Sequence, residues 1–102
     1  MARIIMGTTP TFEYTFKTVD VSTITAAVLT IKQGGEVAIE KTLSDATTTE
    51  TALCWTLTQV ETLSLEKGAA SVMLNWKTSD GTRGASAEEQ LSILTNFVKE
   101  VI

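Results

Sequence analysis

The chain has no histidine, one cysteine (Cys54) and one proline among its 102 residues. Without histidine, Ser-His-Asp and Cys-His catalysis are excluded, and so are the commonest general base and the usual His zinc sites. A single cysteine excludes both an internal disulfide and a CxxC pair, which suits a reducing compartment or a particle assembled inside a cell. The sequence therefore predicts a noncovalent framework that is not an enzyme and has no catalytic, cofactor-binding or metal-binding residues.

Long apolar stretches and runs of positive charge are also missing. No segment approaches the roughly 20 apolar residues that span a bilayer, and Met1 to Met6 is too short for a signal peptide. We therefore expect a soluble product, with no membrane partner, that is not secreted through a signal peptide. The eight Lys and Arg are scattered and the net charge is −4. This distribution argues against a nucleic-acid partner, because such a surface needs clustered cations.

The abundant residues predict β-structure in one domain, residues 1–102. The composition is 43% hydrophobic, which is too apolar for disorder. Nineteen threonines stand among branched and aromatic residues, as is typical of half-buried strands. Five segments alternate with period two. Their inward rows are Phe12, Tyr14 and Phe16 in 11–17; Ala27, Leu29 and Ile31 in 25–32; Val37, Ile39 and Leu43 in 37–43; Leu53, Trp55 and Leu57; and Ala70, Val72, Leu74 and Trp76.

Turn and cap signals separate these segments. Gly34-Gly35 favours a tight hairpin, and Ser79-Asp80-Gly81 predicts another turn. The polar segment 44–50 indicates a surface connection. Thr58 and Glu61 have the spacing of a capping box, which predicts one helical turn ending near Leu65 and closed by Gly68.

The last segment is ambiguous. Ala87, Leu91, Leu94, Val98 and Val101 fall at helical spacing, whereas Leu91 and Ile93 on either side of Ser92 suit a strand. Turn signals at intervals of about 8 to 12 residues favour a sandwich, whose last strand has to come from here. We therefore predict a strand over 88–94 and an irregular or helical tail to Ile102.

Together these patterns predict an all-β, immunoglobulin-like antiparallel β-sandwich of about seven strands, with one short helical turn near residues 59–64. The predicted core includes Phe12, Phe16, Leu29, Ile31, Leu57, Val72, Leu74 and Trp76.

Several polar or reactive residues are candidate sites, and each has a simpler structural interpretation. Cys54 is interpreted as a small hydrophobe in the core or at an interface. The pair Glu88-Glu89 is interpreted as a solvated strand start, because adjacent strand residues point to opposite faces and do not form a glycosidase dyad. Trp55 and Trp76 are interpreted as core residues, since each continues an aliphatic row; an exposed Trp would instead favour sugar binding.

Five apolar residues close to the chain end are difficult to bury in a domain this small. They predict an association surface, which would serve docking or self-association. Its residues are Leu94, Phe97, Val98, Val101 and Ile102.

The chain also resembles a family of small uncharacterised proteins from phages and prophages of Gram-positive bacteria. The likeness covers nearly the whole chain, although Ala87-Glu88-Glu89-Gln90-Leu91 is more helix-friendly than the family strand. The segments that carry it are Gly7-Thr8-Thr9-Pro10-Thr11-Phe12, Val19-Asp20, Ile24, Leu29-Thr30-Ile31-Lys32-Gln33, Glu40-Lys41-Thr42-Leu43, Leu57-Thr58-Gln59, Glu61-Thr62-Leu63, Asp80-Gly81-Thr82 and Ala85-Ser86.

The resemblance implies a small β-sandwich encoded among tail or baseplate genes, akin to amino-terminal domains of baseplate proteins. It implies no catalytic residue. The expected function is that of a virion structural or adaptor protein of a phage tail or baseplate, assembled in the host cytoplasm. Its expected partners are other phage structural proteins or further copies of itself, as a homo-oligomer. A capsid decoration protein and a carbohydrate-binding module for host surface sugar remain the alternatives.

Overall fold

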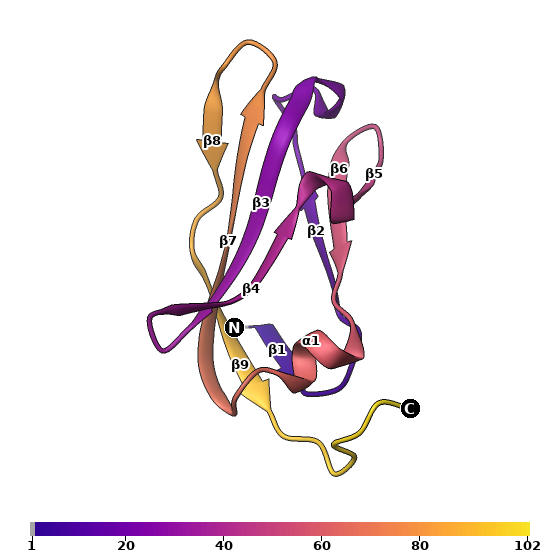
Figure 1. Cartoon of the computed structure of the whole chain (residues 1–102). Coiled ribbons are helices and arrows are strands. Elements are labelled where there is room, and N and C mark those ends of the chain that lie inside the picture. The colour runs from indigo at the N-terminus through magenta and orange to yellow at the C-terminus, as the bar shows by residue number, and fades with distance from the viewer. Residues whose placement is uncertain (1) are drawn as a thin grey trace.

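Two β-sheets pack face to face in the computed structural model, which describes residues 2–102 (Figure 1). The predicted all-β sandwich with one short helical turn is thereby confirmed, with Met1 outside the described residues. The larger sheet has the order β1 (Ala2–Ile5), β9 (Glu89–Leu94), β7 (Gly68–Thr78), β3 (Ile24–Gln33) and β4 (Glu36–Thr42), and β8 (Arg83–Ala85) also pairs with β7. The smaller sheet has the order β2 (Thr11–Thr15), β6 (Ala52–Thr56) and β5 (Thr47–Thr48). The helical pieces are η1 (Val21–Thr23), η2 (Leu43–Asp45) and α1 (Gln59–Leu63).

The strand order follows the immunoglobulin pattern. Strands β2, β6 and β5 pair as B, E and D do, whereas β9, β7, β3 and β4 pair as G, F, C and C′ do. One pair departs from the predicted antiparallel arrangement: β1 runs parallel to β9, from Ala2 opposite Leu91 to Ile5 opposite Leu94. The described chain also has nine strands where about seven were predicted. The strands that alternation missed, β1, β5 and β8, have only two to four residues, which is too few to establish a period.

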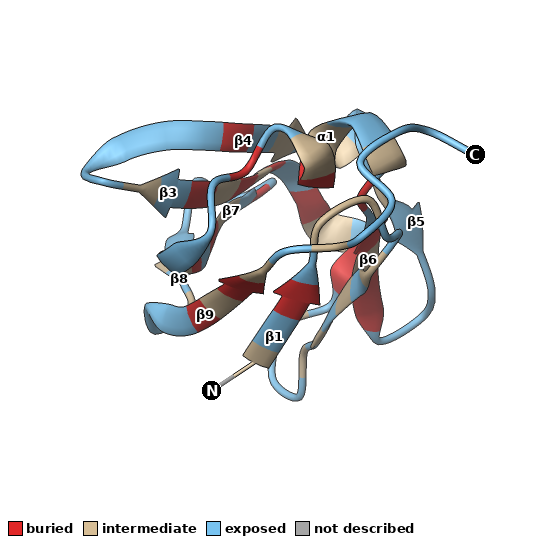
Figure 2. Ribbon diagram, turned by 90° about the horizontal axis from the view of Figure 1, so that it is seen from below, coloured by how far each residue is buried: buried red, intermediate tan, exposed pale blue. Residues whose placement is uncertain are grey.

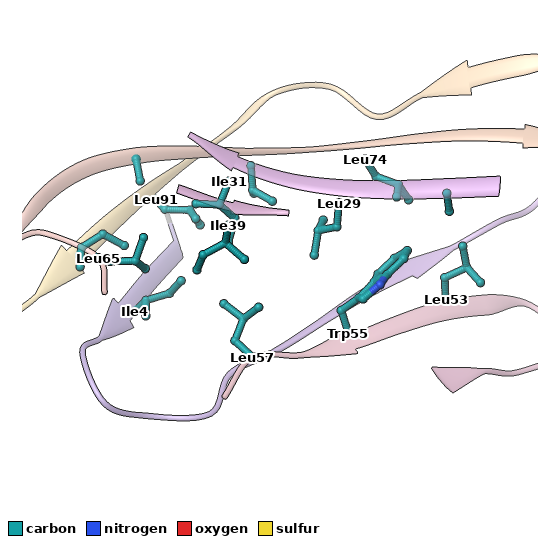
Figure 3. Close-up of a cluster of buried hydrophobic side chains, with 14 of the residues drawn as sticks. Ile4, Leu29, Ile31, Ile39, Leu53, Trp55, Leu57, Leu65, Leu74 and Leu91 are labelled. Carbon is teal, nitrogen blue, oxygen red and sulfur yellow. The ribbon is translucent and has the colours of Figure 1, made fainter. Parts of the chain in front are cut away.

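The core lies between the sheets and is built from the predicted alternating rows. In Figure 3, Leu53 and Trp55 of β6, together with Leu57 just after it, lie opposite Leu29 and Leu74 of the larger sheet, and all five are fully buried. Figure 2 shows that strands of both sheets carry buried residues. The core therefore forms where period-two alternation placed it. Its other buried members include Ile4, Ile31, Ile39, Leu65, Ala70, Val72, Leu91 and Ile93.

Three predicted core aromatics are only half-buried: Phe12, Phe16 and Trp76. They pack against the margin of the core. The Phe16 and Trp76 rings meet edge to face with centroids 5.0 Å apart, and Gly84 of β8 lies opposite Trp76. A Cβ atom at Gly84 would lie 2.4 Å from the indole ring, so a glycine is needed for the ring to lie there.

Val37 was predicted to point inward but is 52% exposed. The cause is a β-bulge in the β3–β4 hairpin: Ile31 pairs with Ile39, but Lys32 pairs with Val37. The extra residue reverses the side-chain alternation on β4. Val37 therefore shares the outer face with Lys32, while Ile39 remains buried. Gly34 and Gly35, both with positive φ, form the predicted turn.

The C-terminal ambiguity resolves as a strand. Leu91 and Ile93 are both buried and Ser92 between them is half-buried, which is strand alternation rather than a helical stripe. Strand β9 begins at Glu89, one residue after its predicted start, and is antiparallel to β7. The residues after Leu94 form no helix.

The capping box that precedes α1 is confirmed. The Thr58 side chain accepts a hydrogen bond from the Glu61 amide at 3.1 Å, and Glu61 Oε1 accepts one from the Thr58 amide at 2.8 Å. The helix ends at Leu63, slightly before the predicted Leu65, with Ser64 as its C-terminal cap. A short helix depends on such contacts because its own hydrogen bonds are few.

Replacing Thr58 with alanine should therefore lower the free energy of unfolding by about 1 kcal/mol, the usual value of a side-chain N-cap. Thr58→Ser is the matched control because it keeps the hydroxyl, and it should restore most of the loss. Both are measured by chemical unfolding. If Thr58→Ala is as stable as the original chain, the cap contributes nothing to the domain.

Candidate interaction surface

Three segments distant in sequence meet at one end of the sandwich: the end of β1, helix α1, and residues 95–102, which we call the tail (Figure 1). Thr62 of α1 joins the first two. Its buried hydroxyl accepts a hydrogen bond from the Gly7 amide at 2.9 Å and donates one to the Thr8 carbonyl at 2.8 Å. The β1–β2 connection is thereby fixed against the helix.

The tail is held by side-chain amides near both of its ends. Asn96 Nδ2 donates to the Met6 carbonyl at 3.0 Å. The Gln59 amide accepts from Ile102 N at 2.9 Å and donates to Ile102 O at 3.0 Å. Between these points the tail forms no helix or strand and lies largely exposed (Figure 2). It follows that the tail is attached to the end of the sandwich by a few hydrogen bonds, of which the Asn96–Met6 bond is partly buried and the Gln59–Ile102 pair is exposed.

Most of the large exposed apolar side chains of the described chain belong to these three segments. Phe97 is 105% exposed, Ile102 92% and Val60 of α1 65%. We call the set of exposed apolar residues on these segments the apolar end. This set makes up six of the eight large hydrophobic residues that are exposed among residues 2–102. Its members are Ile5, Val60, Phe97, Val98, Val101 and Ile102.

An ion pair beside the apolar end ties α1 to the larger sheet. Lys41 Nζ on β4 lies 2.6 Å from Glu61 Oε2. Burial by itself raises the pKa of Glu61, but hydrogen bonds from Lys41 and the Thr58 amide outweigh it and lower the pKa below its ordinary value. Glu61 thus stays ionised while serving both the cap and the ion pair.

The structure places the five predicted interface residues differently. Leu94 ends β9 and is half-buried, whereas Phe97, Val98, Val101 and Ile102 are exposed. Sequence reasoning missed Ile5 and Val60. Each is a single apolar residue in a short element, and long-range hydrogen bonds bring their segments to the tail: Asn96 with Met6, and Gln59 with Ile102.

The contacts and exposure of the other candidate site residues are explained by structural roles. Trp55 is fully buried, and its Nε1 donates to the Thr42 carbonyl at 2.9 Å. Cys54 is half-buried opposite Glu13, so of the two predicted positions, the core or an interface, it does not occupy the core. Its Sγ lies 3.7 Å from Glu13 Oε2, and burial together with the Glu13 charge raises the pKa of the thiol. Glu88 and Glu89 are exposed at the start of β9, as predicted.

An open hollow of about 860 Å³ lies between η1, η2 and the β5–β6 turn. Its polar groups are hydroxyls and two carboxylates, and one of these, Asp20, caps η1 by accepting from the Ser22 amide at 3.0 Å. Among residues 2–102, no three His, Cys, Asp or Glu side chains gather as a metal site. No helix in that range is long and apolar enough to cross a membrane. The apolar end is therefore the most distinctive surface of the described chain.

No family model matches the sequence, and no curated protein is significantly similar to it.

Proposed function

We propose that this protein is a structural or adaptor component of a phage virion, in the tail or baseplate, and that it works by association with other virion proteins or with itself. The observation that carries the proposal is the apolar end, where four tail side chains and two neighbours are exposed together. Contiguous exposed apolar surface marks interaction sites in soluble proteins. The resemblance to phage and prophage proteins is the reason for proposing a phage virion as the assembly.

The mechanism is contact between complementary surfaces. A stable contact buries about 1,200 to 2,000 Å² in total. The tail can enter such a contact without weakening the packing of the domain, because its side chains lie outside the core. Covering Phe97 and Ile102 is the main gain, since both are almost completely exposed before association.

A capsid decoration protein would use the same surface at another part of the particle. Crosslinking with mass spectrometry on intact particles separates the two positions, because the neighbouring protein is then a tail or a capsid component. A sugar-binding module is less well supported. It requires an exposed Trp beside polar groups, whereas Trp55 is fully buried and Trp76 is half-buried against Phe16 and Gly84.

Deleting residues 97–102 should abolish assembly while leaving the fold intact. The deletion removes the four exposed tail side chains, the Gln59–Ile102 pair of hydrogen bonds and the hydrogen bond that the Val98 amide donates to Asn96 Oδ1. Light scattering across a concentration series, and co-purification with the neighbouring virion protein, measure assembly. Thermal unfolding measures the fold.

Val37→Ser is the matched control, because it removes an exposed apolar side chain from β4, away from the tail. It should assemble like the original chain. If the truncated chain keeps its partners and mass but loses thermal stability, the tail belongs to the fold and the proposal is wrong.

A further inference from the structure

Strand β2 lies at an open edge of the smaller sheet. It pairs only with β6 among the described strands. The Phe16 amide donates to the Thr51 carbonyl at 2.7 Å, and the Pro10 carbonyl accepts from the Leu57 amide at 2.9 Å. The backbone N–H and C=O groups of the even-numbered residues therefore point toward β6. Since backbone groups alternate along a strand, the amides and carbonyls of 11, 13 and 15 point away from it, and none of them has a backbone partner within residues 2–102.

The other outer strands are shorter or better protected against pairing. Strands β5 and β8 have only two and three residues. Strand β4 carries a bulge, two exposed glutamates, Glu36 and Glu40, and the Lys41 ion pair to α1. Bulges and charges of this kind are how sheet edges avoid unwanted partners. Strand β1 is only four residues long. Strand β2 has five residues in regular register with β6 and one charged residue, Glu13, so it is the edge most open to another strand.

The inward row of β2 is incompletely covered. Phe12, Tyr14 and Phe16 are all half-buried. The Tyr14 and Trp55 rings meet edge to face, with their centroids 6.3 Å apart. In immunoglobulin sandwiches a first strand lies beside B, which is the position of β2. Here β1 pairs with β9 instead. A strand added at β2 would pair its free backbone groups and cover the aromatic row.

We propose that the open edge of β2 accepts the tail of a second copy of this chain as an added strand. This rests on the proposed function, because it names the partner surface that the tail uses in self-association. Addition of an extended segment to a sheet edge is an established recognition mode, in which the main chain gives affinity and alternate side chains give specificity.

The tail has the length and pattern for this position. Eight extended residues span about 26 Å, whereas the five residues of β2 span about 17 Å. In an extended tail, Phe97 and Val101 share one face and Val98 and Ile102 the other. Either face therefore brings two apolar side chains to the aromatic row.

Charge favours the tail over a second β2. Two β2 strands pairing across a twofold axis centred on Glu13 would place the two Glu13 carboxylates directly opposite each other, which is destabilising. The tail carries Lys99 near its middle. When Val98 and Ile102 face the aromatic row, Lys99 lies on the opposite face, which is the face of Glu13. Tail-to-edge contact joins different surfaces of the two copies, so it is repeated from copy to copy and builds rings or open chains rather than closed dimers.

Glu13→Pro tests the edge directly. Proline removes the Glu13 amide, which points away from β6, so the β2–β6 hydrogen bonds remain. The association constant measured by light scattering should fall about tenfold or more, since proline both removes a donor and obstructs an incoming strand. Glu13→Ala is the matched control: it keeps the amide and should still associate. Circular dichroism checks that both variants fold.

Crosslinking tests whether the segment that pairs with β2 is the tail of a second copy. In a Cys54→Ser background, one preparation carries Glu13→Cys and a second carries a cysteine at one of positions 97 to 101 in turn. Mixing should give a disulfide-linked dimer of the two chains for at least one tail position, whereas a cysteine at Val37 in place of Glu13 should give none. The absence of a mixed dimer at all five positions overturns the proposal.

The two proposals can fail separately. If Glu13→Pro associates as strongly as the original chain while deletion of 97–102 abolishes assembly, the β2 edge is not the acceptor but the proposed function stands. If the deletion leaves every association unchanged, the proposed function itself fails. A purified original chain that stays monomeric across the concentration series overturns the self-association inferred here.

Discussion

Replacing Trp55 with alanine is expected to lower the free energy of unfolding by about 3 to 5 kcal/mol, the range for large-to-small aromatic changes in a core. Trp55 is fully buried in the centre of β6 and fills the space between the sheets (Figure 3). Its loss leaves a cavity and also frees the Thr42 carbonyl, which accepts the indole hydrogen bond at 2.9 Å. Urea unfolding at constant temperature measures the change.

Trp55→Phe separates the two contributions. It keeps much of the ring volume but removes the Nε1 donor, so it should cost less than the alanine change and more than a simple surface substitution. A loss below about 1 kcal/mol for Trp55→Ala, the size of an ordinary substitution, would mean that Trp55 does not fill the core as described.

Replacing Leu74 with alanine should cost about 2 to 5 kcal/mol, the usual range for a buried Leu. Leu74 is fully buried in β7 and lies opposite Leu29 of β3. Ser86 fixes its backbone on the other side: the Ser86 hydroxyl accepts from the Leu74 amide at 2.9 Å, and the Ser86 amide donates to the Leu74 carbonyl at 2.8 Å. Because the backbone is held, the sheet cannot easily close over a cavity here.

Met73→Ala is the matched control for Leu74. Met73 is the preceding residue of the same strand, and its side chain is on the outer face and exposed. Its replacement should change stability by less than about 1 kcal/mol, measured in the same unfolding experiment. Similar losses at the two positions would contradict the assignment of the two faces of β7.

Long alternating segments made much of this fold predictable from sequence. Strands β3 and β7 have ten and eleven residues, enough for period-two alternation to identify the buried face. The capping box was predictable for another reason: Thr58 and Glu61 are three residues apart, so the contact is local. Each of these features depends on neighbours in sequence, and that is the information that a single sequence contains.

The errors have long-range causes. The orientation of Val37 depends on a bulge, which appears only when β4 is aligned with β3. Strand β1 exists because it pairs with β9, some ninety residues away in the chain. At the candidate surface, the apolar tail was visible in the sequence, but Ile5 and Val60 were not, because hydrogen bonds across the fold bring their segments to it.

The parallel pairing of β1 with β9 also determines how the domain carries mechanical load. Ala2 begins one strand of the pair and Leu94 ends the other, so tension applied between the two chain ends pulls the strands past each other along their length. The ladder over four residue pairs is then loaded in shear, and its hydrogen bonds must break together rather than in sequence, as they would in a hairpin opened from its end. Resistance to such tension depends on the rate of unfolding rather than on equilibrium stability. Strand β1, an outer strand of only four residues, is therefore the one that resists extension of the chain.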